Sequence, residues 1–205
     1  MLPFLNVIYE DRDVFVVNKP SGLLSVPGRG EEKFDSVQSR CQALCAGAMA
    51  VHRLDMATSG ILMIAKHKEA ERHYKTVFEK RFASKTYIAI AQGIMSEKQG
   101  SMTEPMRTDW ERRPIQMIDF EQGKPAHTDF EVLSYEQGHT RVKLYPHTGR
   151  SHQLRLHLAH RGHPILGDEF YGNAQLSPRL LLHATALKLP RLDGKSLHII
   201  CPTPF

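Results

Sequence analysis

The chain alternates short apolar runs with polar turns, and this pattern predicts more strands than helices. Residues 4–9 and 14–18 are rich in β-forming side chains and flank EDRD, which predicts a hairpin. Residues 126–135 and 140–146 alternate apolar and polar side chains around EQGH, which predicts a second hairpin. Further strands are expected over 61–65, 87–91, 180–189 and 196–200. Because hairpins dominate the connections, the predicted class is α+β with a largely antiparallel sheet.

Helical periodicity is clearest over residues 67–82. Apolar side chains there recur at helical spacing on one face, at Ala70, Tyr74, Val77, Phe78 and Phe82. A shorter helix is expected to start at Asp35 as its N-cap and to run to about Leu44. A third is expected over residues 151–161, where Gly162 would end it.

Composition restricts the class of protein. The 205 residues are 41% hydrophobic and 24% charged, which is ordinary for a globular domain and excludes disordered, collagen-like and disulfide-scaffold chains. No apolar run approaches the roughly 20 residues that span a bilayer. The first residues lack a basic region before their apolar stretch, so we expect a cytoplasmic protein. Cys41, Cys45 and Cys201 are expected to be reduced thiols.

Positive charge is concentrated in two segments. The net charge is +5, but residues 66–93 and residues 148–205 each hold 7 Lys and Arg against 3 Asp and Glu. Two basic segments are what a polyanion-binding surface requires, provided that the fold brings them together. Two solvated basic faces with no partner explain the same charges, so charge alone leaves nucleic acid binding open.

A polar, turn-rich cluster, HRLDMATSG, runs directly into the apolar stretch 61–65. Asp55 lies two residues after Arg53 at the mouth of the predicted strand, a place from which a carboxylate can project into a cleft. Small hydroxyl residues and glycine can satisfy the backbone around it. A structural turn with an Arg–Asp ion pair remains the alternative at this point.

Two further stretches carry candidate chemistry. Tyr87 begins a predicted strand and would serve either as a core residue or as a stacking platform for an extruded base. TGRSHQLR joins a strand to a helix, with Thr148 or Ser151 available as a cap. Free N–H groups at a helix start favour an anion such as phosphate, although an ordinary capped helix fits the same residues. Arg150 and Arg155 lie near that start, where cations need an anionic partner.

The sequence holds 12 histidines, several of them in the third predicted helix. His157 and His160 have a spacing that could hold a metal ion. No carboxylate lies at ligand spacing in that helix, so hydrogen-bonded or solvated histidines are the better explanation and no metal is expected.

Taken together, these motifs resemble the RluA family of pseudouridine synthases. The resemblance is carried, in the family's order, by VVNKPSGLLSVPG, HRLDMATSG, KTYIA, TGRSHQLR, HPILGD and RLLLHA. It covers the chain from about residue 6 to the end and is strongest to the member that modifies both ribosomal and transfer RNA. HRLD followed by TSG is specific by itself, whereas residues 94–125 are the least motif-like part.

The resemblance implies a fold and an activity. The fold would be the pseudouridine synthase fold, a long mixed, mostly antiparallel sheet with flanking helices and a central catalytic cleft. Residues 1–205 would form a single catalytic domain without the S4-like RNA-binding domain of several relatives. The reaction would isomerise uridine to pseudouridine in RNA and needs no cofactor. Transfer RNA anticodon arms and 23S ribosomal RNA stem-loops are the expected partners of a monomer that has no membrane contact.

The resemblance also assigns roles to five residues. It implies that Asp55 is the catalytic carboxylate and that Arg150 pairs with it. A desolvated carboxylate needs such a cation to stay charged. Tyr87 would pack on the uracil, Arg53 would fill the space that the extruded nucleotide leaves, and Leu182 would form the apolar wall of the base pocket.

Two other classes of protein compete with this assignment. A non-catalytic RNA-binding module explains the charge pattern but gives no reason for an Asp55–Arg150 pair. A histidine-dependent metal hydrolase explains the histidines but lacks a coherent set of ligands.

Overall fold

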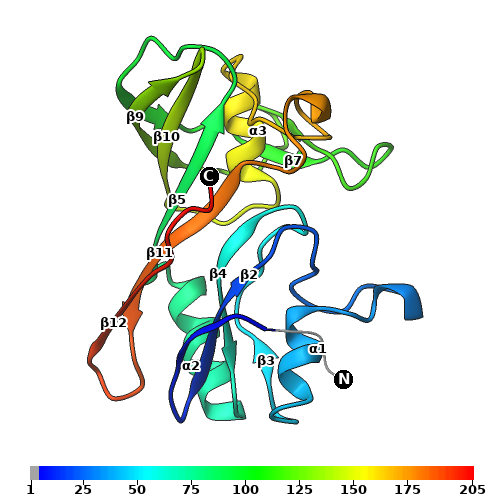
Figure 1. Cartoon of the computed structure of the whole chain (residues 1–205), viewed down its shortest axis with the longest axis vertical. Coiled ribbons are helices and arrows are strands. Elements are labelled where there is room, and N and C mark those ends of the chain that lie inside the picture. The colour runs from blue at the N-terminus through cyan, green and yellow to red at the C-terminus, as the bar shows by residue number, and fades with distance from the viewer. Residues whose placement is uncertain (1–4) are drawn as a thin grey trace. The chain divides into compact units, whose positions relative to one another are not determined.

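The computed structural model describes residues 5–205, which divide into two compact units (Figure 1). The first unit runs to Ser84 and includes His183–Pro204, and the second holds Lys85–Leu182 with Phe205. The helices are α1 (Val37–Gln42), α2 (Lys68–Glu79) and α3 (Gln153–His160), with short 3-10 turns at Glu31–Lys33 and Ala174–Leu176. The strands are β1 (Val7–Glu10), β2 (Val14–Lys19), β3 (Met49–Ala50), β4 (Ser59–Ala65), β5 (Ser84–Ala91), β6 (Gln99–Met102), β7 (Met106–Thr108), β8 (Gln116–Ile118), β9 (Thr128–Glu136), β10 (His139–Pro146), β11 (Leu182–Pro190) and β12 (Ser196–Ile200).

The first unit is built on a mixed sheet. β4 pairs antiparallel with β2 and β3, and its first residues pair in parallel with β11, which in turn forms a hairpin with β12 (Figure 1). All seven residues of β4 are buried. Burial on both faces explains why this strand is a continuous apolar run instead of an alternating one.

The second unit is antiparallel. β10 pairs with β5 on one side and with β9 on the other (Figure 1). β6 pairs with β9. β7 and β8 form a separate two-stranded ribbon. Met106 and Ala126 pack with Leu156 of α3 in a small apolar cluster, which places this ribbon beside the helix. The sequence pattern did not predict β6, β7 or β8.

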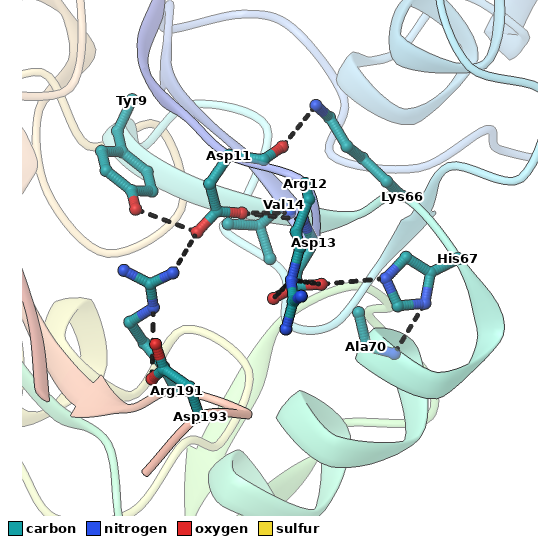
Figure 2. A network of polar contacts seen from close by, with 10 residues as sticks. All are labelled: Tyr9, Asp11, Arg12, Asp13, Val14, Lys66, His67, Ala70, Arg191 and Asp193. Atoms are coloured by element: carbon teal, nitrogen blue, oxygen red, sulfur yellow. Dashed lines mark hydrogen bonds and ion pairs between the residues drawn. The ribbon is translucent and has the colours of Figure 1, made fainter. Parts of the chain in front are cut away.

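The two predicted hairpins are confirmed as β1–β2 and β9–β10, although residue 4 lies outside the described part of the chain. The β1–β2 turn is tied to the rest of the first unit by the polar network in Figure 2. Asp11 accepts hydrogen bonds from the backbone N–H groups of Asp13 and Val14 and forms an ion pair with Arg191 at 3.1 Å. Burial acts to raise the pKa of Asp11, but these hydrogen bonds outweigh it, so the pKa is lowered.

The helices depart from their predictions at the ends. Ala70, Tyr74 and Val77 of α2 are buried as predicted, but Phe82 lies beyond the end of the helix and is 61% exposed. The predicted N-cap of α1 was wrong by one residue, because Ser36 forms a capping box with Ser39. The predicted cap, Asp35, instead forms an ion pair with Arg40.

Two simpler expectations concern the whole described chain. The three cysteines are free thiols, as predicted. No helix within residues 5–205 is long and apolar enough to cross a membrane.

Candidate active site

Asp55 lies in the loop that leads into β4. Its side chain is half-buried, while Arg53 is exposed and Leu54 is buried. The backbone N–H of Thr58 donates to the carbonyl of Asp55 at 3.1 Å, which closes a tight turn immediately after the carboxylate. The loop therefore presents Asp55 at the edge of the core.

A buried lysine from the end of β2 holds this loop. Lys19 is fully buried, and its ammonium donates hydrogen bonds to the carbonyls of Pro20, Leu23 and Met56 at 2.7–2.9 Å. A buried charge is tolerated only where hydrogen bonds compensate its desolvation. Because one acceptor is the residue after Asp55, this lysine fixes the loop from the side of β2.

Two serines from the same segment complete the attachment. The Ser25 hydroxyl donates to the carbonyl of Leu54 at 2.7 Å and accepts from its N–H at 3.0 Å. The Ser21 hydroxyl donates to the carbonyl of Ala57 at 2.7 Å. The backbone is thus anchored on both sides of Asp55. The segment KPSGLLS is part of a motif of the family, but its sequence alone indicates no role for Lys19, Ser21 or Ser25.

The neighbours of Asp55 in its motif have structural roles. His52 accepts a hydrogen bond from the N–H of Met63 through Nε2, and its ring stacks on Phe78 at 4.3 Å. Gly60 has a φ of +111°, and a Cβ there would lie 2.3 Å from the carbonyl oxygen of Ala184. Glycine is therefore required where β4 and β11 approach each other.

In the second unit, Gln153 organises the turn that carries Arg150. Its Oε1 accepts from the Thr148 hydroxyl and from the Arg150 N–H, at 2.7 and 3.0 Å. Its Nε2 donates to the carbonyl of His127 and to the Thr128 hydroxyl. The predicted caps, Thr148 and Ser151, were wrong, since His152 precedes α3 in a left-handed conformation without a side-chain cap.

The two arginines of this motif lie in different environments. Arg150 is half-buried, and its Nε donates to the carbonyl of Pro125 at 3.1 Å. Arg155 is 2% exposed and forms a bidentate ion pair with the fully buried Asp168, with both hydrogen bonds at 2.7 Å. The anionic partner that Arg155 required is therefore a carboxylate of this chain, from the HPILGD motif.

The remaining candidates also belong to the second unit. Tyr87 is half-buried in β5, opposite Leu144 of β10. Leu182 is 3% exposed at the start of β11. The first unit thus supplies Arg53 and Asp55, whereas the second supplies the other three candidates. The pairing of Asp55 with Arg150 stays a prediction.

His157 is hydrogen-bonded, as predicted. Its Nδ1 contacts the Thr128 hydroxyl and its Nε2 contacts the carbonyl of Glu104, both at 3.1 Å. Burial lowers the pKa of His157, which favours the neutral ring. A ring with both nitrogens engaged in this way is a poor metal ligand.

Comparison with known proteins decides among the three classes. Residues 13–160 match the family described as RNA pseudouridylate synthase. The chain belongs to the RNA pseudouridylate synthase family. It isomerises uridine to pseudouridine in RNA, so the catalytic interpretation is favoured over an RNA-binding module without chemistry.

Individual relatives agree with this family. The chain is 49% identical to a dual-specificity RNA pseudouridine synthase RluA of Escherichia coli O6:H1 and 51% identical to that of Haemophilus influenzae. Each alignment covers 99% of this chain and 95% of the relative. Among solved structures, human RNA pseudouridylate synthase domain containing 1 superposes with a TM-score of 0.85 and 30% identity, over 100% of this chain and 86% of that one. The predicted pseudouridine synthase fold is therefore confirmed.

Proposed function

We propose that this synthase modifies uridines in transfer RNA anticodon arms and in 23S ribosomal RNA stem-loops, with Asp55 as the catalytic carboxylate. The relatives that support the substrate are named dual-specificity enzymes and match nearly the whole chain at about half identity. Arg150 pairs with Asp55, Tyr87 packs on the uracil, Leu182 lines the base pocket and Arg53 takes the place of the extruded nucleotide.

The reaction defines what Asp55 must do. The bond between C1′ and N1 breaks, the uracil turns, a bond forms between C1′ and C5, and the proton on C5 leaves while N1 is protonated. A carboxylate can serve by attacking the sugar covalently or by removing a sugar proton, and both roles require its ionised form. Arg150 supplies the positive charge that favours this form in a desolvated site.

The observation that carries the assignment of Asp55 is the anchoring of its loop. Lys19, Ser21 and Ser25 together hold the backbone of the residues before and after this half-buried carboxylate. A solvated turn has no need of a fully buried ammonium and two serine hydroxyls. A catalytic carboxylate does need such support, since a small displacement from the reacting atom is costly in rate.

The turn of Arg150 is supported in a comparable way. Gln153 fixes the N–H of Arg150, and Pro125 accepts from the guanidinium Nε. The Nε contact uses one edge of the guanidinium, and the guanidinium carries five N–H donors in all. The remaining donors suit the planar, bidentate recognition of a carboxylate.

The proposed substrate follows from the cost of extruding a base. A base in a loop is already partly unstacked, so extruding it costs less than extruding a paired base, by a few kcal/mol. Sequence-specific RNA recognition usually targets such single-stranded loops. The two basic segments would supply phosphate contacts, and such contacts release counterions and weaken as salt rises.

The test offers the purified protein three RNAs with tritium on uridine C5: an anticodon stem-loop, a 23S stem-loop and a fully paired duplex of matching sequence. We expect tritium release from both stem-loops, little from the duplex, and binding that weakens steeply with salt. Equal release from the duplex, or affinity that does not change with salt, would contradict the proposed substrate while leaving the synthase activity established.

A further inference from the structure

Three side chains of types that can bind a metal ion converge at one end of the β9–β10 hairpin, outside the residues assigned to catalysis. They are His127, Asp129 and His147, whose ligand atoms all lie within 4.8 Å of one another. His127 Nε2 lies 2.9 Å from Asp129 Oδ1, and His147 Nε2 lies 2.6 Å from Asp129 Oδ2. Both imidazoles therefore face the same carboxylate.

The strand register explains why these residues meet. Tyr145 and Pro146 of β10 pair with Asp129 and Thr128 of β9. His147 continues this ladder, because its N–H donates to the carbonyl of His127 at 3.0 Å. His127 directly precedes β9 and lies two residues from Asp129, a spacing that places side chains on one face of extended chain, and directly opposite residues share a face as well. The convergence is thus set by the backbone.

We propose that His127, Asp129 and His147 form a binding site for a divalent transition-metal ion of the zinc class. Two imidazoles and a carboxylate are ligands that zinc accepts, and three protein ligands leave one position for water. Donor atoms bound to one tetrahedral zinc ion at about 2.1 Å lie roughly 3.4 Å apart. The two distances from imidazole nitrogen to carboxylate oxygen, 2.9 and 2.6 Å, lie within about 1 Å of that spacing.

The surroundings hold these ligands in place. The Ser101 hydroxyl of β6 donates to Asp129 Oδ1 at 2.5 Å, so the carboxylate is oriented by a group behind it. The backbone N–H of His127 donates to the Thr148 hydroxyl at 2.8 Å and fixes the main chain that carries this ring. The imidazole rings of His127 and His147 stack with centroids 4.3 Å apart. A hydrogen bond such as that from Ser101, made to a ligating carboxylate from outside the cluster, fixes ligand orientation in known metal sites.

Exposure and ligand chemistry select the kind of ion. The side chains of His127, Asp129 and His147 are 42%, 39% and 50% exposed, so an ion and its water can enter. Imidazole favours zinc, copper, nickel and cobalt ions over magnesium and calcium, which prefer oxygen ligands. A bound ion would join the start of β9 to the end of β10 and so stabilise the second unit.

The experiment titrates Zn²⁺ into untagged, chelator-treated protein in competition with a chromophoric zinc chelator. We expect one equivalent to bind, and we expect His127→Gln and His147→Gln each to lower the affinity at least tenfold. His160→Gln is the matched control, since His160 is an exposed histidine of the same unit outside the cluster. Cys45→Ser controls for the half-buried thiol. Both controls should bind like the wild type.

Two further measurements distinguish loss of the metal site from loss of the folded structure. The melting temperature without metal should be similar in all variants, and Zn²⁺ should raise it only where the cluster is intact. Co²⁺ should give visible bands typical of tetrahedral nitrogen and oxygen ligands, without a thiolate charge-transfer band. Equal affinity in wild type and in a His127→Gln/His147→Gln variant would overturn the proposal and leave a cluster held by hydrogen bonds. Loss of binding in Cys45→Ser would also overturn it.

Discussion

Among single residues, Arg150 and Arg155 lie five positions apart and have different roles. Arg155 is buried, forms a bidentate ion pair with Asp168, and lies over the rings of Phe170 and Tyr171 at 5.1 and 5.5 Å. Arg150 is half-buried and is held mainly by contacts around its backbone and its Nε. Substitution of Arg155 should therefore reduce mainly the stability of the protein, whereas substitution of Arg150 should reduce mainly its turnover.

Arg155→Ala should lower the free energy of unfolding by about 3–5 kcal/mol, because it leaves the Asp168 carboxylate buried without its partner. Arg150→Ala should change the free energy of unfolding by about 1 kcal/mol or less but should remove turnover. Urea denaturation and tritium release from uridine-labelled RNA measure the two effects. Full activity in Arg150→Ala would contradict its assigned role, and an unchanged unfolding midpoint in Arg155→Ala would contradict the buried pair.

Tyr74 illustrates a buried polar group that costs stability. It is fully buried in α2, and its hydroxyl has no hydrogen-bond partner among residues 5–205. Burial, together with the negative charges of Asp11 and Asp13, raises the pKa of Tyr74 to about 12.

Tyr74→Phe should therefore leave the protein as stable as the wild type or more stable, by up to about 1–2 kcal/mol, since it removes an unsatisfied polar atom while keeping the ring. The free energy of unfolding from urea denaturation is the measurement. Destabilisation of more than about 1 kcal/mol would show that the hydroxyl makes a contact of its own.

At the scale of elements, the turn between β8 and Gly123 depends on one carboxylate. Asp119 accepts from the backbone N–H groups of Gln122 and Glu121 and from the guanidinium of Arg107. These hydrogen bonds lower the pKa of Asp119 from its ordinary value of 3.8 to about 2.

A carboxyl group whose pKa is lowered by folding stabilises the native state above its unfolded pKa and loses that effect as the pH falls through its native pKa. Asp119→Ala should thus lower the melting temperature at pH 7, and the difference from the wild type should shrink between about pH 4 and pH 2. Glu121→Ala, which removes an exposed side chain in the same turn, is the control. A difference that stays constant with pH would contradict the role of the charge.

Elements that are fixed by nearby residues could be predicted from the sequence, whereas elements that depend on distant contacts could not. β4 and the two hairpins follow from local pattern, because burial and turn chemistry act within a few residues. The strands β6, β7 and β8 are short and partly polar, so their sequences carry a weak strand pattern. The partner of β6, β9, also lies far along the chain. The start of α3 was mispredicted because Gln153 ties its first turn to residues 127 and 128 instead of a local cap.

At the scale of the whole molecule, the sequence motifs identified the family and its candidate site residues. They did not reveal the residues that support those candidates. Lys19 and Ser25 act on the Asp55 loop from about thirty residues away or more, and periodicity carries no signal for such contacts. The cluster of His127, Asp129 and His147 was missed for the same reason, since His147 meets His127 only through strand pairing.

We propose that this synthase converts uridine in RNA through Asp55. The most direct measurement compares wild type with Asp55→Asn for tritium release from C5-labelled uridine in a stem-loop, with RNA affinity measured in parallel. We expect release by the wild type in the presence of a chelator, no release by Asp55→Asn, and affinities within about tenfold, or 1.4 kcal/mol, of each other. Turnover by Asp55→Asn near the wild-type rate would contradict it.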